Sequence, residues 1–575
     1  MGNTLSTNYT YEDTILPLGP GMGSLRGKLV DGRVKRFTGV PYAKPPTGEY
    51  RWRKTRPLDP DHVYASSPEP GGNREPPLQP LDCTRFSAQA WQTPMQLPFG
   101  NKEGEEEGGG PRYDEDCLML NIWMPAGGEE GEGRPMGNPC MDDISDPTEL
   151  ISSAALKCIF IAPAYRLGVF GFLASQELAD EAGNDGDDGA GGVVGNYGMW
   201  DQWTAMRWVQ RYGAALGGDL SNVTLAGMSA GAYSVHAQVA HALLMEKDQV
   251  GSSKSLAVKR IALAYPWLPG VRHSNAIPTN PKSLHEVQPQ FNELLAVHGI
   301  SQDLPGKEKL AALRRVGAKV LTEKVKEMER HTFRPVADGK FFPKDLFKRF
   351  IEGEFANEFE KRGMSVLVGE VLNEECTYRM GAPKEMSGLR AEIANLYPGT
   401  VTDKLIHAYT VDKIQVPAAL PDPNPHIGAT EKLYGDIVSD GQVRAPERLL
   451  IQQLREAGVP LSRVHRYLIG FKPTFVKKVI PDMLGVPHGS DGALWNYAVG
   501  FVAASATLVG TTRDDKQVMT EWISDLVKFV NGKEMDYGTT KWSEQKFLGP
   551  DGNISIRQDR KWDYLMQVAH LMADE

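Results

Sequence analysis

The sequence predicts an α/β fold built around a largely parallel sheet, and three observations support this prediction. Short apolar runs alternate with longer segments of helical spacing over most of the chain, which is typical of strands and helices that follow one another. One apolar run leads into a serine between two glycines, a pattern that fits a sharp turn from a strand into a helix. The chain has 575 residues, of which 41% are hydrophobic and 24% are charged, so it can bury a large core.

The predicted strands are short apolar runs, and the predicted helices are longer segments with helix-like spacing of their apolar residues. The strands are residues 120–125, 157–163, 222–227, 365–369 and 463–471. The helices between them include residues 201–216 and 229–245.

The glycine-flanked serine is Ser229, in the sequence G-M-S-A-G at residues 227–231. A predicted strand precedes this pattern and a predicted helix follows it, which is the context of a nucleophile elbow. We expect Gly227 and Gly231 to remove side chains that would collide with the strand and the helix, so that the Ser229 hydroxyl is presented as a nucleophile. A helix N-cap is the alternative role for a serine at this position.

A serine hydroxyl needs a base to accept its proton, and the base needs an acid to orient it. Of the twelve histidines, His488 is the best placed, because it lies in a Gly- and Pro-rich loop after the strand at residues 463–471. His236 and His241 lie on the helix that leads away from Ser229, so we expect them to have structural roles.

Two adjacent carboxylates, Glu374 and Glu375, follow the predicted strand at residues 365–369. They lie between the serine and His488 in the chain, which is the order of serine, acid and histidine found in enzymes with this elbow. A loop carboxylate is more often simply solvated, and position alone does not choose between the two glutamates.

Several longer stretches resemble the type-B carboxylesterase and cholinesterase family of α/β-hydrolases. They are FTGVPYAKPPTGEYRW (37–52), DEDCLMLNIWMP (114–125), YRLGVFGFL (165–173), GNYGMWDQWTAMRWV (195–209) and LGGDLSNVTLAGMSAGAYS (216–234). The matches extend to Asp491 in the HG-D setting of His488. The resemblance implies one α/β-hydrolase domain over residues 37–575, preceded by an N-terminal segment at residues 1–36.

The resemblance also implies the roles of the site residues. Ser229 matches the nucleophile, His488 the general base, and Glu374, the fifth residue after Gly369, the acid. The backbone N–H of Ala230 matches one oxyanion donor. The family resemblance further implies a small-molecule ester as substrate, an acyl-enzyme intermediate, and no metal or organic cofactor. Family members usually have glycine after the acid; a second carboxylate in its place would raise the pKa of one of the pair.

Two smaller departures concern single residues. Met228 stands where the family commonly has glutamate, and we expect this to tune the site rather than abolish it. Ala90 stands where the family has the first cysteine of a disulfide, which leaves Cys117 without its partner and agrees with a reducing compartment.

The serious departure is a missing motif between residues 125 and 157. The family has a strand there that ends in His-Gly-Gly, whose N–H groups form part of the oxyanion hole; this chain has no such run and no apolar strand in the interval. We therefore expect one sheet strand to be missing, as if a coding segment had been lost between Pro135 and Met136, and the esterase activity to be impaired. The alternative is a noncatalytic binding or adhesion-type protein on the same fold.

Composition limits the partners and the location. The formal net charge of -10 and the pI near 5.8 argue against nucleic acid binding. The start has no secretory signal pattern and we expect a cytoplasmic protein. Gly2 and Ser6 fit an N-myristoylation pattern, which would allow membrane contact, although an ordinary disordered terminus fits as well. The five cysteines predict neither a disulfide framework nor a zinc site, and the sequence predicts no oligomeric state.

Overall fold

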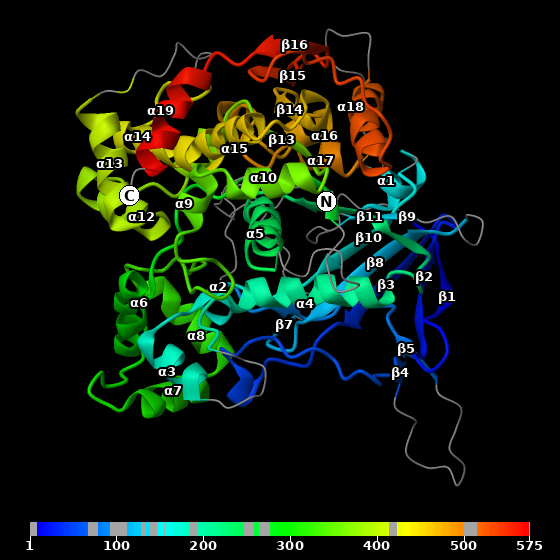
Figure 1. Ribbon diagram of the computed structural model, residues 1–575, viewed down its shortest axis with the longest axis horizontal. Coiled ribbons are helices and arrows are strands. Elements are labelled where there is room, and N and C mark those ends of the chain that lie inside the picture. The colour runs from blue at the N-terminus through cyan, green and yellow to red at the C-terminus, as the bar shows by residue number, and fades with distance from the viewer. Residues whose placement is uncertain are drawn as a thin grey trace.

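The computed structural model describes residues 9–66, 79–92, 112–127, 134–137, 146–154, 156–184, 192–246, 258–263, 276–412, 414, 422–498 and 514–573. One mixed sheet of 14 strands runs through this part of the molecule, with helices packed on both of its faces (Figure 1). The predicted α/β fold is confirmed.

The sheet has a parallel part and an antiparallel part. The parallel strands, in spatial order, are β15 (Glu544–Leu548), β14 (Val464–Ile469), β13 (Ser365–Val371), β12 (Val258–Leu263), β11 (Gly218–Gly227), β9 (Arg134–Gly137) and β10 (Ile159–Pro163). β16 (Ile554–Gln558) adds antiparallel to β15, and β8 (Met119–Pro125), β3 (Val34–Pro41), β2 (Ser24–Val30) and β1 (Tyr11–Pro17) follow antiparallel beyond β10. Strands β8, β10, β11, β13 and β14 confirm the five predicted strands.

Short strands complete the N-terminal part. β5 (Gln79–Asp82) pairs with β2 and β4 (Ala65–Ser66), while β6 (Gln89–Ala90) and β7 (Tyr113–Asp114) form a separate pair. Strands β1 and β2, and the first residues of β3, precede Phe37, where the sequence placed the start of the domain. They are hydrogen-bonded into the main sheet, which therefore begins before residue 37.

Alternate residues of the central strands contribute to two different cores. In β13, Val366 and Val368 belong to one cluster of buried side chains, and Leu367 between them belongs to another. Helices α4 (Tyr197–Tyr212) and α5 (Ala230–Leu244), both predicted, contribute to the first cluster, and α18 (Asp515–Val530) contributes to the second. The side-chain period of two in a strand therefore places the sheet between two apolar layers.

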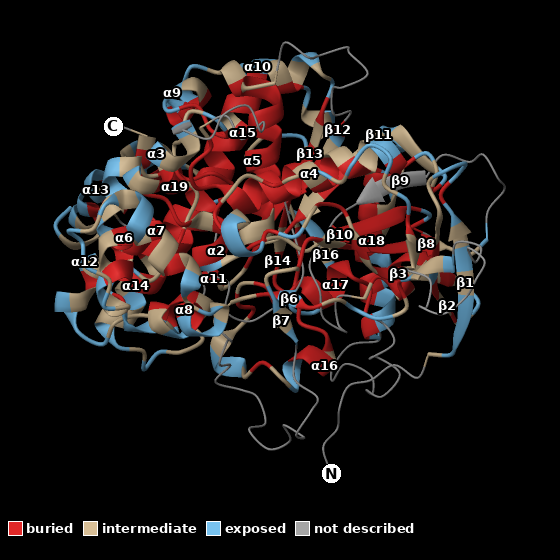
Figure 2. Cartoon of the chain, turned by 90° about the horizontal axis from the view of Figure 1, so that it is seen from below, coloured by how far each residue is buried: buried red, intermediate tan, exposed pale blue. Residues whose placement is uncertain are grey.

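The remaining helices surround these layers, and α5 is drawn in Figure 2 almost entirely as buried residues. The helices are α1 (Thr148–Ser152), α2 (Gly168–Phe172), α3 (Gln176–Asn184), α6 (Leu284–Val297), α7 (Gly306–Arg315), α8 (Ala318–Lys324), α9 (Leu346–Ile351), α10 (Glu354–Lys361), α11 (Glu374–Arg379), α12 (Met386–Leu396), α13 (Gly399–Thr410), α14 (Ala429–Ser439), α15 (Ala445–Glu456), α16 (Thr474–Lys477), α17 (Gly492–Trp495) and α19 (Trp562–Ala573). A π-helical turn, Asp440–Arg444, joins α14 to α15.

The expectation of a missing strand is wrong for the backbone. Strand β9 occupies the position between β10 and β11, where Met136 pairs with Ile159 on one side and with Val223 on the other. The reason is that backbone groups on β10 and β11 need partners whatever side chains the inserted segment carries. β9 has only four residues, and one of them is Pro135, which has no backbone N–H to donate to the ladder. The sequence therefore has no apolar pattern from which this strand could be predicted. Pro135 and Met136 are consecutive in β9, so an insertion between them would interrupt this strand.

The predictions about cysteines, membrane spans and the N-terminus concern single residues or segments. Cys83, Cys117, Cys158 and Cys376 are buried and free, so the prediction that Cys117 has no disulfide partner is confirmed. No helix in the described part of the chain combines the length and apolarity that a membrane span requires. Gly2 lies outside the described residues, and N-myristoylation and a cytoplasmic location stay predictions.

Candidate functional site

The serine predicted as nucleophile occupies a strained turn. Ser229 lies between the end of β11 and the start of α5, is buried, and has φ 51° and ψ −120°. Residues other than glycine rarely adopt this region, and such strain gathers at functional sites. The local sequence allows it because Gly227 has no side chain: a Cβ there would lie 2.3 Å from the carbonyl carbon and oxygen of Gly231.

The expected role of Gly231 is wrong in this structure. A Cβ added to Gly231 would meet no atom within 4 Å outside its own helix. The contact is one-sided, because the Cβ position of Gly227 points at the Gly231 backbone while that of Gly231 points into open space. Only the first glycine of the pattern is required by steric contact.

Ala230 is the first residue of α5 and follows Ser229 directly. The N–H groups of the first helical turn have no partner inside a helix, so this donor remains available at the elbow. Residues 128–133, before β9, and 138–145, after it, lie outside the described residues.

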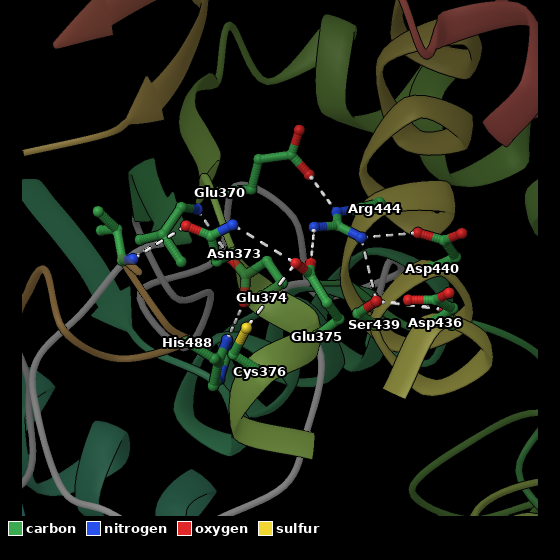
Figure 3. A network of polar contacts seen from close by, with 12 residues as sticks. Glu370, Asn373, Glu374, Glu375, Cys376, Asp436, Ser439, Asp440, Arg444 and His488 are labelled. Carbon is green, nitrogen blue, oxygen red and sulfur yellow. Dashed lines mark hydrogen bonds and ion pairs between the residues drawn. The ribbon is translucent and has the colours of Figure 1, made fainter. Parts of the chain in front are cut away.

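Glu374 and His488, separated by more than one hundred residues, are in direct contact. The Oε2 atom of Glu374 accepts a hydrogen bond from Nδ1 of His488, and both side chains are buried (Figure 3). The other oxygen, Oε1, accepts from the backbone N–H of Val371 at 2.8 Å. Glu374 begins α11 immediately after β13, so the end of this strand fixes both carboxylate oxygens.

The segment before Glu374 also holds the histidine loop. The side chain of Asn373 accepts a hydrogen bond from the N–H of Val486 at 3.0 Å, and its backbone N–H donates to the Val486 carbonyl at 3.0 Å. Thr377, one turn into α11, donates from Oγ1 to the His488 carbonyl at 3.2 Å. The loop that carries the histidine is therefore attached on two sides to the segment that carries the acid.

The elbow and the histidine loop meet through their neighbours. A Cβ built on Gly489 would lie 3.7 Å from Sδ of Met228, the residue before Ser229. Nε2 of His488, the ring nitrogen that does not face Glu374, is buried and has no hydrogen-bond partner among the described residues. The structure thus brings Glu374 and His488 together, and places the histidine loop against the serine turn.

The second glutamate of the pair has a different partner. Oε2 of Glu375 accepts a hydrogen bond at 2.6 Å from Nη2 of Arg444, which lies on the π-helical turn. Burial alone would raise the pKa of Glu375, but Arg444 lowers it to about 2. The side chain turns away from His488 toward Arg444 in Figure 3. The second carboxylate was expected to raise the pKa of one of the two glutamates. Glu375 is instead paired with Arg444, which lowers its pKa.

A third carboxyl, Asp491, lies close to the pair. It is buried and accepts a hydrogen bond from Nε1 of Trp495 at 2.9 Å. Burial, with a contribution from Glu374, raises its pKa to about 6. Burial would lower the pKa of His488, but Glu374, and to a smaller extent Asp491, raise it above the ordinary value of 6.5.

Sequence reasoning missed the supporting residues. Asn373 stands one position before a predicted site residue, and its polar character in that loop was the available signal, while Asp491 was noted only as part of the pattern around His488. Arg444 lies 69 positions from Glu375, and no local pattern links them.

The two histidines on α5 have the structural surroundings that the sequence predicts. Nδ1 of His236 accepts from the N–H of Ile277 at 3.1 Å, and Nδ1 of His241 lies 2.8 Å from the Phe341 carbonyl. Burial lowers the pKa of His236 to about 3 and that of His241 to about 4, so both are neutral at pH 7. In the described part of the chain, no three His, Cys, Asp or Glu side chains are grouped as metal ligands.

Comparisons with known proteins identify the family of the chain. The model of the carboxylesterase family matches residues 16–560. An uncharacterized esterase/lipase of Schizosaccharomyces pombe is 33% identical over 96% of each chain, and a carboxylic ester hydrolase of Gibberella moniliformis is 31% identical over 97% of this chain and 95% of its own. The crystal structure of Aspergillus niger EstA has the same fold, with a TM-score of 0.66 at 18% identity, covering 97% of this chain and 98% of that one. Since the family model spans nearly the whole chain, the protein belongs to the carboxylesterase family.

Proposed function

We propose that the protein hydrolyses carboxylic esters through an acyl-enzyme intermediate, with Ser229 as nucleophile, His488 as general base and Glu374 as the acid that orients it. The observation that carries the proposal is the hydrogen bond between Glu374 and Nδ1 of His488, which leaves Nε2 as the available base, beside a serine in the strained elbow conformation.

The chemistry follows from these positions. Nε2 of His488 takes the proton of Ser229 as Oγ attacks the ester carbonyl, and the tetrahedral intermediate carries its charge on the former carbonyl oxygen. The imidazolium formed is stabilised by Glu374. His488 then gives the proton to the departing alcohol, which leaves an acyl group on Ser229. Water, activated by the same histidine, releases the carboxylic acid.

Stabilisation of the oxyanion is the weakest part of the proposed site. The N–H of Ala230 supplies one donor, while the His-Gly-Gly run that would supply others is absent from the sequence. Loss of a single oxyanion donor costs roughly 10²- to 10³-fold in rate. We therefore expect aryl esters, whose leaving groups need less stabilisation, to be hydrolysed faster than alkyl esters.

The test is steady-state and stopped-flow hydrolysis of 4-nitrophenyl butyrate. The proposal predicts turnover above the buffer rate in the full chain, and a loss on the order of 10⁴-fold or more in Ser229→Ala. Ser234→Ala, on the same helix, serves as the matched control and should keep most of the activity. Equal rates in the Ser229→Ala variant and the unchanged protein would exclude Ser229.

A noncatalytic binding role on the same fold is the second candidate. The relatives described above carry enzyme names, and this chain retains the serine in its elbow, so the comparisons do not favour that role. If a folded preparation gave no rate above buffer with any aryl ester, the binding role would replace the proposal.

A further inference from the structure

The segment that carries the acid and the loop that carries the histidine run side by side for a short stretch. The pairing of β13 with β14 ends at Val371 and Ile469. The chain then returns to the same edge of the sheet, where Asn373 and Pro487 form an isolated parallel bridge. His488 follows this bridge directly, so the position of its backbone depends on how the bridge is held.

Val486 presents both of its backbone polar groups to Asn373. Its side chain is buried, so its N–H needs a partner inside the protein. Oδ1 of Asn373 accepts from this N–H at 3.0 Å, and the backbone N–H of Asn373 donates to the Val486 carbonyl at 3.0 Å. The next residue, Pro487, has no backbone N–H to donate. The asparagine side chain therefore supplies the acceptor at this point of the loop.

Gly485 makes the close approach of the amide possible. It has φ 58° and ψ −129°, nearly the conformation of Ser229, and glycine adopts this region without strain. A Cβ on Gly485 would lie 2.2 Å from Oδ1 of Asn373 and 2.7 Å from its Cγ. A side chain at this position would therefore displace the amide from the Val486 N–H.

The other end of the amide fixes its orientation. Nδ2 of Asn373 donates to Oε1 of Glu375 at 3.5 Å, and Arg444 holds Glu375 in turn (Figure 3). Because Val486 offers a donor and Glu375 an acceptor, only one orientation of the amide satisfies both. An asparagine suits this place because it accepts at one end and donates at the other.

The contact at Val486 acts on the backbone that carries His488, two residues further on. Glu374 bonds to Nδ1 and so orients the ring, while Thr377 donates to the His488 carbonyl at 3.2 Å. Neither bond holds the loop before the histidine. That part of the loop is held by Asn373, which therefore acts on the placement of the whole residue.

We propose that Asn373 is a positioning residue for ester hydrolysis, which together with Gly485 holds the histidine loop where Nε2 of His488 reaches Ser229. It acts through the histidine and not on the substrate. Proton transfer from serine requires hydrogen-bond reach, and a misplacement of about 1 Å can lower the rate by roughly 10²-fold. This inference rests on the proposed ester hydrolysis and adds a residue to it.

The experiment measures kcat and KM for 4-nitrophenyl butyrate in Asn373→Leu and Asn373→Asp. Leucine has a similar size but no acceptor, so Asn373→Leu should lower kcat about 10- to 100-fold and change KM less than about threefold. Asn373→Asp keeps the acceptor and should restore kcat to within about threefold of the unchanged protein. Each rate is taken at the pH of its maximum, because an added carboxylate shifts the pH profile.

The matched control for Asn373→Leu is Asn395→Leu. Asn395 lies on α12 and also bonds to a backbone group, donating from Nδ2 to the Glu329 carbonyl at 3.0 Å. A general loss of stability would affect both variants. The positioning role predicts that Asn395→Leu keeps kcat within about threefold.

Gly485→Ala keeps the test decisive if Asn373→Leu fails to fold, because it leaves the asparagine in place. It should lower kcat about tenfold or more, while Gly458→Ala, which also has positive φ but meets no atom within 4 Å, should lower kcat less than about threefold. In an Asn373→Ala background the loss from Gly485→Ala should shrink, because the atom that the new Cβ would strike is gone.

A kcat within about threefold of the unchanged protein in folded Asn373→Leu, or equal losses in Asn373→Leu and Asn373→Asp, would overturn the positioning role. Independent, multiplicative losses from Gly485→Ala and Asn373→Ala would overturn the pairing of the two residues. In each case ester hydrolysis by the unchanged protein would stand. Absence of turnover by the unchanged protein would instead overturn the proposed function, so the two failures are distinguishable.

Discussion

Glu375, which is partly buried, accepts a hydrogen bond at 2.6 Å from the buried Arg444, and its neighbour Glu374 faces His488 (Figure 3). Arg444 also bonds to Asp440. A carboxylate beside the acid of a triad would compete for the histidine, and the arginine prevents this by holding it on the far side of α11.

Neutralising the two glutamates one at a time should therefore give unequal results. We expect Glu374→Gln to lower kcat for aryl esters by roughly 10³- to 10⁴-fold, because the amide cannot stabilise the imidazolium or select its tautomer. The Glu375 side chain does not contact His488, so Glu375→Gln should lower kcat less than about tenfold. Steady-state kinetics on both variants checks this prediction, and the opposite ranking would assign the acid to Glu375.

Removing the arginine should destabilise the fold. Arg444→Met leaves Glu375 and Asp440 buried without their cation, and breaking buried pairs in this way costs about 3–5 kcal/mol. Arg390→Met is a matched control, since Arg390 pairs with Asp403 on the exposed surface and should cost less than about 0.5 kcal/mol. Urea unfolding followed by fluorescence measures both changes. Equal losses of unfolding free energy in the two variants would show that the buried Arg444 ion pairs contribute no more to stability than an exposed pair.

The two glycines of the elbow should respond differently to alanine. We expect Gly227→Ala to destabilise the protein by about 1–3 kcal/mol and to lower kcat/KM, because the new Cβ would overlap the Gly231 backbone. Gly231→Ala meets open space within a helix, where alanine is favoured by about 1 kcal/mol. It should keep both stability and activity. Thermal unfolding and ester turnover test the pair, and inactivation by Gly231→Ala would restore the role that the sequence suggested.

The pH dependence should respond to Asp491. His488 must be neutral to act as base, and its pKa is raised by Glu374 and, to a smaller extent, by Asp491, so kcat/KM should increase as the pH rises above 6.5. Asp491→Asn removes one of the negative charges that favour the imidazolium. The acid limb of the profile should then move to lower pH. A limb that stays in place, or moves to higher pH, would contradict this electrostatic account.

The sequence predicts the parts of this fold that apolar patterning controls. β8, β10, β13 and β14 are buried along most of their length, and their apolar runs stand out in the sequence. β9 has no such run, because its place in the sheet is determined by the pairing of its backbone with β10 and β11.

The candidate site divides in the same way. Ser229 and His488 stand in local patterns of glycines and neighbours that a sequence displays. The contact of Glu374 with His488, and of Glu375 with Arg444, joins segments far apart in the chain, so only the folded structure shows it. The difference between Gly227 and Gly231 depends on the direction of one Cβ vector, which a residue pattern does not contain.

The central claim is that Ser229 is the nucleophile of the ester hydrolase. The most direct measurement is reaction of the full chain with a fluorophosphonate, followed by mass spectrometry of the labelled peptide. The account predicts one phosphonyl group per chain on Ser229, no labelling in Ser229→Ala, and much slower labelling in Glu374→Gln. Labelling of a different residue, or equal labelling in the Ser229→Ala variant, would contradict it.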